Sequence, residues 1–529
     1  RTLRSTQFSE DAGPLAHPVR PRAYKEINNF YTPTVYEKGA EVIRMLKVLI
    51  GDDAFKRGMD LYFERCDGTA ATIEEFLACF AETSGQNLDH FARWYEQAGT
   101  PTIVASGRYD AAAKRYTLDL AQSTPPTPGQ TEKQPVVLPI KLGLVGAKGD
   151  LPLKTASNAY AGDGLIVLDQ ASLSITFEDV PEAPIPSLMR GFSAPARLDL
   201  DLSDSDLLRL FSADSDSFNR WQSLQSVATR VLVAAGKPGA DANVLTTTAS
   251  KLGEALQVFL KADALSDPAF AAQVLRLPAP ADIAREIGGD VDPDAIFAAH
   301  RKLSGAIGKA LLGELPGLRG ALAASGAYRP DAASAGRRAL RNELLGLAAL
   351  AAPTEAADLC EGQFTGGDNL TDRLAALAAM TLIPGERREA LIRRFAEAYA
   401  GEPLVLDKWL MAQALIAEPG TLERVKQLMQ HPAFSLGNPN RVRALIGGFA
   451  ANLTQFNRAD GAGYEFVADI VVALDKTNPQ VASRLLGSFK SWRMLEPGRK
   501  RLAQEALGTV ARLPNLSRDV ADIAERALA

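Results

Sequence analysis

Apolar side chains recur with a helical period over residues 36–99. They return every three or four positions, a spacing that places them on one face of an α-helix. The first such face comprises Val42, Met45, Leu46, Leu49 and Ile50. Thr72 and Glu75 have the Thr-x-x-Glu spacing of a capping box, which marks the start of a further helix. Residues 1–35 have no sustained period and contain four prolines, so we expect a loop or tail there, followed by packed helices.

The period falls from 3.6 to two after Thr100-Pro101. Tyr116, Leu118 and Leu120 alternate with polar residues, and turn sequences such as Gly162-Asp163-Gly164 separate the short apolar runs. Three prolines between residues 181 and 186 close the segment. This pattern predicts a small antiparallel β-sandwich over residues 101–185.

Beyond Pro195 the helical period returns and continues to the end of the chain, and no strand pattern follows. Prolines divide this region into short amphipathic helices, with breaks at Pro316, Pro353, Pro384, Pro432 and Pro479. Such helices, joined by tight breaks, are typical of an α-superhelix, although the sequence has no strict repeat. The predicted fold class is a multidomain α protein with a small β-sandwich, divided into residues 1–100, 101–195 and 196–529.

The charge balance and the composition exclude several classes of partner. The 529 residues hold 58 Lys and Arg against 63 Asp and Glu, a formal net charge of −5, so the chain lacks the basic surface that nucleic-acid binding requires. The longest apolar stretch, Leu344 to Ala352, is far shorter than the ~20 residues needed to cross a bilayer, and we expect no membrane contact. Cys66, Cys79 and Cys360 are too few for a disulfide framework, which favours a reducing compartment.

The sequence has no self-contained catalytic motif. Its four histidines include no pair at i, i+4, so there is no His-Glu-x-x-His zinc helix, and no cluster of Cys and His replaces it. Phosphate-binding, nucleophile-elbow and dinucleotide-binding motifs are absent as well. Three adjacent cations, Arg499, Lys500 and Arg501, are interpreted as a solvated helix face.

One segment near the start of the chain has a more specific sequence. It is Gln-Phe-Ser-Glu-Asp-Ala-Gly-Pro-Leu-Ala-His-Pro-Val-Arg-Pro over residues 7–21 and Asn-Asn-Phe-Tyr-Thr-Pro-Thr-Val-Tyr-Glu-Lys-Gly-Ala-Glu-Val-Ile-Arg-Met over residues 28–45. These runs closely resemble the zinc aminopeptidases of the aminopeptidase N family, in the bacterial form. Later runs resemble the same family in order, at residues 94–101, 132–135, 192–195, 438–441 and 478–484. The resemblance therefore covers essentially the whole chain.

The resemblance implies the architecture and the chemistry of that family. Residues 1–100 would form the helical end of a thermolysin-like catalytic domain, followed by a β-sandwich and by a helical superhelix that closes over the active site. The family's zinc ligands and its Gly-x-Met-Glu-Asn strand would lie before Arg1. We therefore expect a carboxy-terminal fragment that has no zinc ligands of its own. Peptide substrates, a cytoplasmic location and a monomeric state are further expectations.

The resemblance also implies a catalytic role for one tyrosine. In the run Val-Tyr-Glu-Lys-Gly it assigns to Tyr36 the phenol that donates a hydrogen bond to the oxyanion of the tetrahedral intermediate. A phenol stays protonated at neutral pH and so can donate where negative charge develops. Without the resemblance, a tyrosine at the start of a helix would be interpreted as a packing residue.

Five further residues match positions that contact the substrate in that family. Asn28 and Tyr31 match the stretch that lines the substrate site, and Glu37 follows the tyrosine to which the resemblance assigns the catalytic role. The alternative role of these three residues is local hydrogen bonding and packing. Arg443 and Arg484 match superhelix segments near the peptide channel, where a guanidinium can engage a carboxylate or a carbonyl. Their alternative role is a structural ion pair.

Two functional hypotheses stay open at this point. The first is the carboxy-terminal part of a zinc-dependent aminopeptidase. The second is a non-catalytic helical module that binds peptides or another protein. The lack of a metal-ligand set favours the second hypothesis for the chain taken alone. The run around Tyr36 favours the first, because a scaffold has no need of an oxyanion donor.

Overall fold

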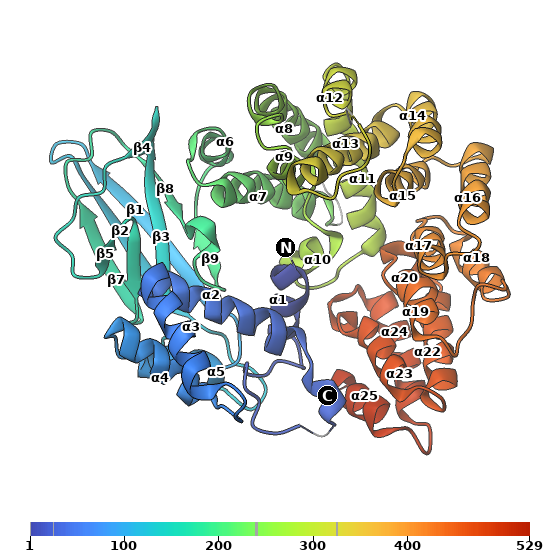
Figure 1. Ribbon diagram of the computed structural model, residues 1–529, viewed down its shortest axis with the longest axis horizontal. Helices are drawn as coiled ribbons and strands as arrows, with labels where there is room; N and C mark the ends of the chain where they lie inside the picture. Colours follow the sequence, from blue (N-terminus) through green and yellow to red (C-terminus); the bar gives the residue numbers. More distant parts are fainter. Residues whose placement is uncertain (1, 25, 238–241, 324–325, 529) are drawn as a thin grey trace. The chain divides into compact units, whose positions relative to one another are not determined.

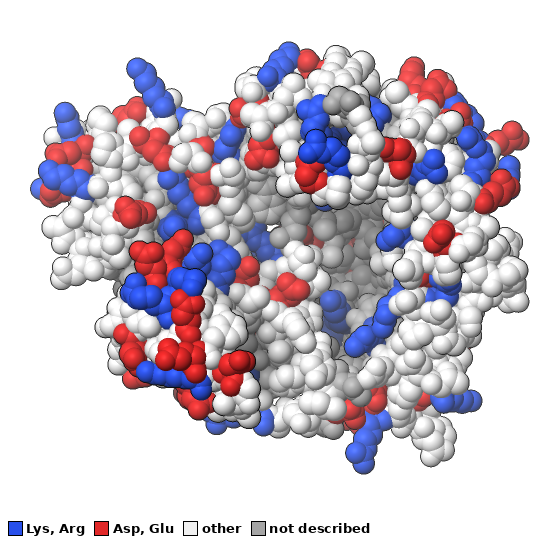
Figure 2. All heavy atoms as spheres, viewed as in Figure 1, with Lys and Arg blue, Asp and Glu red and all other residues white. Residues whose placement is uncertain are grey.

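The computed structural model describes residues 2–24, 26–237, 242–323 and 326–528, and the chain divides into two compact units, Arg1–Ser223 and Leu224–Ala529 (Figure 1). The first unit holds a group of helices and then two β-sheets, and the second unit is built of helices. Figure 2 shows Lys and Arg side chains interspersed with Asp and Glu side chains on the face that it presents, as the near-balanced charge predicts. In the described residues, no helix combines the length and the apolar composition needed to span a membrane.

Helices fill the first hundred residues, including part of the segment expected to be irregular. The short turns are η1 (Leu3–Gln7), α1 (Phe8–Asp11), η2 (Ile27–Phe30) and η3 (Thr34–Lys38). The longer helices are α2 (Gly39–Ile50), α3 (Asp52–Cys66), α4 (Ile73–Ser84) and α5 (Asp89–Glu96). The expectation of a loop or tail is wrong for residues 3–11, 27–30 and 34–35, because these stretches contain no proline and their backbone amides are free to form helical bonds.

The predicted capping box at the start of α4 is confirmed. Thr72 Oγ1 accepts a hydrogen bond from the Glu75 backbone amide at 3.2 Å, and the Glu75 carboxylate accepts one from the Thr72 amide at 2.7 Å. The helix places Phe80 in the core, where it is fully buried against α3. Gly58 of α3 makes room for this ring, since a Cβ at that position would lie 2.4 Å from Phe80 Cδ1.

Two sheets follow the helices. The first has the strand order β7-β2-β1-β9, and the second has the order β4-β3-β6-β5 with β8 also paired to β3. The strands are β1 (Thr102–Asp110), β2 (Arg115–Ser123), β3 (Leu138–Gly146), β4 (Gly149–Leu151), β5 (Tyr160–Gly162), β6 (Leu165–Leu168), β7 (Ser172–Phe177), β8 (Ile185–Leu188) and β9 (Arg197–Leu200). Tyr116, Leu118 and Leu120 of β2 are buried, as their alternation predicts.

The sheets extend further along the chain than the sequence pattern indicates. β8 continues past residue 185 to Leu188, β9 lies wholly beyond it, and β9 pairs in parallel with β1, with Thr102 opposite Arg197. The limit at residue 185, the purely antiparallel arrangement and the lack of strands after Pro195 are therefore wrong. The reason is that β9 has four residues, which is too short for a period of two to stand out, and its pairing depends on β1 almost a hundred residues earlier.

The rest of the described chain is helical. The elements are η4 (Arg190–Phe192), α6 (Asp204–Ala213), α7 (Ser217–Ala235), α8 (Ala242–Asp263), α9 (Pro268–Leu275), α10 (Pro280–Ile287), α11 (Pro293–Ala310), α12 (Leu315–Ala321), α13 (Ala332–Ala351), α14 (Pro353–Gly366), α15 (Leu370–Met380), α16 (Glu386–Ala398), α17 (Pro403–Ala414), α18 (Thr421–Leu428), α19 (Pro439–Val442), η5 (Arg443–Gly447), α20 (Gly448–Ala450), α21 (Leu453–Phe456), α22 (Ala462–Asp475), α23 (Pro479–Leu486), η6 (Gly487–Phe489), η7 (Trp492–Met494), α24 (Pro497–Ala511) and α25 (Arg518–Leu528). Pro353 and Pro479 open α14 and α23, which confirms these two predicted breaks, since proline fits the first helical turn.

The second unit is closed by contacts between residues some two hundred positions apart. Val291 and Leu495 form a parallel β-bridge. Beside it the buried Arg499 of α24 forms ion pairs with Asp292 and Asp294 and donates to the Asn457 carbonyl at 2.6 Å. The interpretation of residues 499–501 as a solvated face is therefore wrong for Arg499, because its acceptors come from distant segments.

Candidate functional site

Tyr36 and Glu37 lie in a π-helical turn. In η3 the amide of Gly39 donates to the carbonyl of Thr34, five residues back, which is the hydrogen bond that defines a π-helix. Such turns are rare in proteins overall, and those that occur are often found at functional sites. Arg443 lies in another π-helical turn, η5, in the second unit. Two segments carrying predicted site residues thus share an unusual backbone geometry that has no sequence signature.

The phenol of Tyr36 is presented to solvent. Its side chain is 59% exposed, and no described residue forms a hydrogen bond with its hydroxyl. The ring lies 6.2 Å from that of Tyr31, which in turn meets Phe30 edge-on at 5.9 Å. These aromatic contacts support the side of the ring and leave the hydroxyl able to donate to an incoming group.

The structure brings Tyr31, Tyr36 and Glu37 into one region. Glu37 is half-buried, and among the described residues it has neither an ion pair nor a hydrogen bond to its carboxylate. Asn28 belongs to η2, and its side chain lies outside the described part of the structure.

A buried ion pair lies at the end of η3. Lys38 Nζ is 2.9 Å from Asp11 Oδ2, and both side chains are 1% exposed. The same ammonium donates to the Gly99 carbonyl at 2.8 Å, and Asp11 Oδ2 also accepts from Thr100 Oγ1 at 2.9 Å. The pair therefore ties η3 to α1 and to the link between α5 and β1.

A second set of hydrogen bonds holds the start of η3. Glu10 Oε1 accepts from both the amide and the hydroxyl of Thr34, at 3.0 and 2.6 Å. Thr32 Oγ1 accepts from the Val35 amide at 3.2 Å and lies 2.9 Å from His17 Nε2. Both ends of the turn are thus fixed to the segment that precedes it.

The two arginines predicted to contact peptide belong to the second unit. Arg443 is exposed, and its guanidinium donates to Asn440 Oδ1 at 3.1 Å. Arg484 is exposed on α23 and forms no ion pair with any described residue. The alternative role as a structural ion pair therefore receives no support from the described residues for Arg484.

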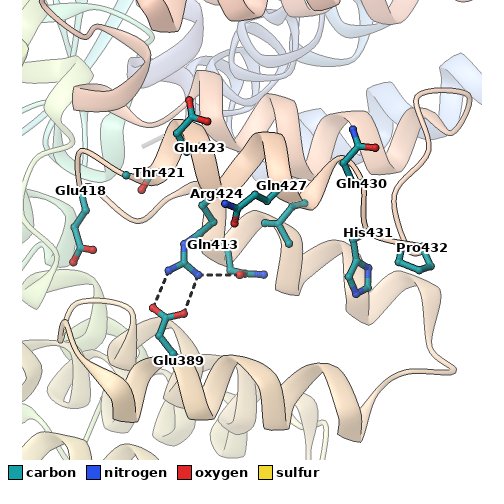
Figure 3. A pocket seen from close by; sticks show the side chains of 12 residues that line it. Glu389, Gln413, Glu418, Thr421, Glu423, Arg424, Gln427, Gln430, His431 and Pro432 are labelled. Carbon is teal, nitrogen blue, oxygen red and sulfur yellow. Dashed lines mark hydrogen bonds and ion pairs between the residues drawn. The ribbon is translucent and has the colours of Figure 1, made fainter.

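A pocket of about 610 Å³ lies among α16, α17 and α18 (Figure 3). Arg424 extends across it to Glu389, with two hydrogen bonds of 2.8 and 3.0 Å, and reaches Gln413 at 3.2 Å. Glu418, also on its wall, pairs with the buried Arg388. None of the predicted site residues lines this pocket, and its carboxylates at positions 389 and 418 are neutralised within the protein.

The described residues do not fit a resident zinc ion. Among them, no group of three or more His, Cys, Asp and Glu side chains is placed to hold a metal. His17, which lies near η3, has Nδ1 2.7 Å from the Pro18 carbonyl and Nε2 2.9 Å from Thr32 Oγ1. Both of its ring nitrogens are therefore engaged.

Sequence reasoning missed the residues that support η3. Nothing in the pattern marks Glu10, Asp11 or Lys38 as buried or paired, because charged residues in a short helical turn ordinarily face solvent. The available signal was weak: two adjacent carboxylates, Glu10 and Asp11, precede their partners Thr34 and Lys38 by 24 and 27 positions.

Family models match the chain in three consecutive parts. A peptidase family M1 domain matches residues 2–95, a domain of unknown function with an Ig-like fold (DUF3458) matches residues 99–201, and a domain of unknown function with ARM repeats (DUF3458_C) matches residues 204–529. This order confirms the predicted fold class, a catalytic-domain portion followed by a small β domain and a helical array.

Known proteins match along the whole chain. The aminopeptidase N of Caulobacter vibrioides is 44% identical over 100% of this chain and 60% of its own length, and that of Escherichia coli is 37% identical over the same shares. The crystal structure of Legionella pneumophila aminopeptidase A in complex with aspartic acid matches with a TM-score of 0.84 and 26% identity, over 98% of this chain and 59% of that one.

The chain spans about 60% of the length of the curated relatives it matches. More than half of its own residues match one model, the ARM-repeat domain. The chain therefore belongs to the DUF3458_C family and corresponds to the carboxy-terminal part of aminopeptidase N.

Proposed function

We propose that the chain works as the carboxy-terminal part of a zinc aminopeptidase that removes amino-terminal residues from peptides. In this function Tyr36 donates a hydrogen bond to the oxyanion that forms on the scissile carbonyl. The observation that carries the proposal is the exposure of Tyr36, whose hydroxyl has no described partner and which stands on a turn held at both ends. The relatives named aminopeptidase N support the reaction class.

Donation by a phenol suits the negative charge that develops during peptide hydrolysis. A donor aimed at the oxyanion stabilises the transition state more than the ground state, and its removal commonly lowers kcat by about 10²–10³. Zinc would polarise the carbonyl in the intact enzyme. Because the described residues do not fit this ion, its ligands would come from elsewhere in that enzyme.

The remaining predicted residues have proposed roles around the peptide. Asn28, Tyr31 and Glu37 would contact the substrate next to Tyr36, and Arg443 and Arg484 would each bind a carbonyl or carboxylate group of a peptide. Tyr31, Arg443 and Arg484 are exposed, which supports access by a ligand. We also propose the division into 1–100, 101–195 and 196–529, a cytoplasmic location and a monomeric state.

A second candidate is a non-catalytic module that binds peptides or a protein. One observation favours it: Leu404, Met411 and Leu415 are all exposed and are spaced to share one face at α17. A module of this kind would bind peptides without needing the hydroxyl of Tyr36.

The substitution Tyr36→Phe distinguishes these candidates. It is made in the chain joined to the part of Caulobacter vibrioides aminopeptidase N that the chain does not match. We expect kcat for an alanyl anilide to fall about 10²–10³-fold with little change in KM. Tyr24→Phe is the matched control, since Tyr24 has the same 59% exposure, and it should leave kcat unchanged. Equal rates for both variants would reject the catalytic role.

A further inference from the structure

We propose that Lys38 and Asp11 act as positioning residues for Tyr36, setting the place of its hydroxyl through the π-helical turn that Lys38 ends and Asp11 anchors. This inference rests on the proposed function, because it concerns how the oxyanion donor is placed. It assigns a role to a buried charge pair that the reaction itself does not use.

Two adjacent carboxylates hold the two ends of one turn. Thr34 is the first residue of η3, Tyr36 is the middle one and Lys38 is the last. Glu10 accepts both hydrogen bonds from Thr34, and the next residue, Asp11, forms the ion pair with Lys38. The residue with the exposed phenol is thus the midpoint of a five-residue span that is anchored on each side.

The Lys38–Asp11 pair is a costly way to fill a core. A buried ion pair loses much of its attraction to desolvation, and apolar residues of similar volume often stabilise a fold equally well. Here the cost is increased because Asp11 Oδ1 is buried with no hydrogen-bond partner among the described residues. The contribution of the pair to stability does not explain why it is there, whereas a role in placing the turn does.

The hydrogen bonds of Lys38 explain how the ion pair can position the turn. Lys38 Nζ bonds the Asp11 carboxylate and the Gly99 carbonyl, so it fixes η3 against two separate segments. The Tyr36 hydroxyl has no described partner of its own, so the backbone turn and the neighbouring ring of Tyr31 define where it stands. A displacement of about 1 Å at a reacting centre can cost a rate factor of about 10².

A double-mutant cycle tests this inference. Lys38→Met, Tyr36→Phe and the double variant are compared with the unaltered protein in the joined enzyme described above. We expect Lys38→Met to lower kcat about 10–100-fold with KM within about 3-fold, and to have less than about a 2-fold effect when Tyr36 is already Phe. A loss of the same size in both backgrounds would overturn the positioning role. If Tyr36→Phe alone leaves kcat unchanged, the proposed function fails, and this inference fails with it.

Two further measurements keep the test decisive if Lys38→Met folds poorly. The double substitution Asp11→Asn with Lys38→Met removes both charges, so we expect this variant to fold. It should still lower kcat when Tyr36 is present, and it should have little effect on kcat when Tyr36 is replaced by Phe. In the chain alone, the amides of Tyr36 and Gly39 should exchange hydrogen faster in this variant than in the unaltered chain. Unchanged exchange and unchanged kcat would overturn the inference.

Arg190→Met is the matched control for stability. Arg190 pairs with the buried Asp214 in the same unit, so its loss also leaves a buried carboxylate without its cation. We expect lower thermal stability but the same kcat, with or without the Tyr36 hydroxyl. A loss of kcat in Arg190→Met equal to that in Lys38→Met would show a general effect of stability and reject the positioning role.

Discussion

Tyr36 and Lys38, two positions apart in η3, occupy opposite environments. The tyrosine side chain is 59% exposed, and the lysine side chain is 1% exposed. Residues at i and i+2 of a helical turn do not face each other, so one turn can direct a phenol to solvent and an ammonium into the core. The exposed phenol and the buried ammonium are therefore neighbours in sequence, while Asp11 and Gly99, the partners of the ammonium, lie far away along the chain.

Close packing around Gly58 leaves no room for a side chain at this position. Gly58→Ala would place a Cβ 2.4 Å from Phe80 Cδ1, and we expect it to lower the free energy of unfolding by about 1–3 kcal/mol. The measurement is urea unfolding followed by circular dichroism.

The control for this packing effect is Gly362→Ala in α14. Gly362 is exposed and has open space around its Cβ position, so alanine should be neutral or stabilise the helix by up to about 1 kcal/mol. Equal effects of the two substitutions would contradict the steric account.

An element can be predicted from the sequence when the residues that determine it lie close together in the chain. The capping box at Thr72 and the helices that begin at Pro353 and Pro479 could be predicted, because each depends on residues within one helical turn. The parallel strand β9 and the π-helical turn η3 could not, because each depends on partners far along the chain.

At the level of elements, Arg190 of η4 ties β4 to the α6–α7 turn. It forms two hydrogen bonds with Asp150, at 2.7 and 2.8 Å, and a third with Asp214. The hydrogen bonds from Arg190 hold the pKa of Asp150 below its usual value. A lowered carboxyl pKa contributes stability above the unfolded-state pKa of about 3.9, and this stability is lost as the pH falls through the folded-state pKa.

Asp150→Asn should therefore destabilise the protein at pH 7 and lose this effect in acid. The gap in thermal midpoint between the unaltered chain and the variant should close as the pH falls below about 4. Asp163→Asn is the control, because Asp163 is exposed in a turn and has no ion pair among the described residues. A gap that stays constant from pH 7 to pH 3 would contradict the role of the Asp150 carboxylate.

On the scale of the whole molecule, long-range contacts decide which charges are structural. Arg499 and Arg501 are two positions apart on α24, yet Arg499 is buried among acceptors from distant segments and Arg501 forms an exposed i, i+4 pair with Glu505. The sequence alone does not distinguish the buried Arg499 from the exposed Arg501.

This contrast predicts very different costs for two similar substitutions. Arg499→Met should lower the free energy of unfolding by about 2 kcal/mol, because it removes charge-assisted bonds that close the second unit. Arg501→Met should change it by less than about 0.5 kcal/mol, since exposed pairs contribute little. Urea unfolding of both variants checks this, and equal losses would refute the closing role of Arg499.

The candidate site was predictable in part. The run around Tyr36 is a sequence motif that identified the family and that predicts a catalytic role for the phenol. The anchors at Glu10 and Asp11 left none, since a buried ion pair is recognised by what surrounds it. The positions of Arg443 and Arg484 were likewise read from motifs, and their roles stay predictions.

The central claim, that this chain contributes Tyr36 to a zinc aminopeptidase, is tested most directly by zinc content and alanyl anilide hydrolysis measured on the same samples. The chain alone should hold no stoichiometric zinc and cleave the anilide at no enzyme-like rate. The chain joined to the part of the Caulobacter vibrioides enzyme that it does not match should show both. Zinc and enzyme-like hydrolysis in the chain alone, or neither in the joined protein, would contradict the account.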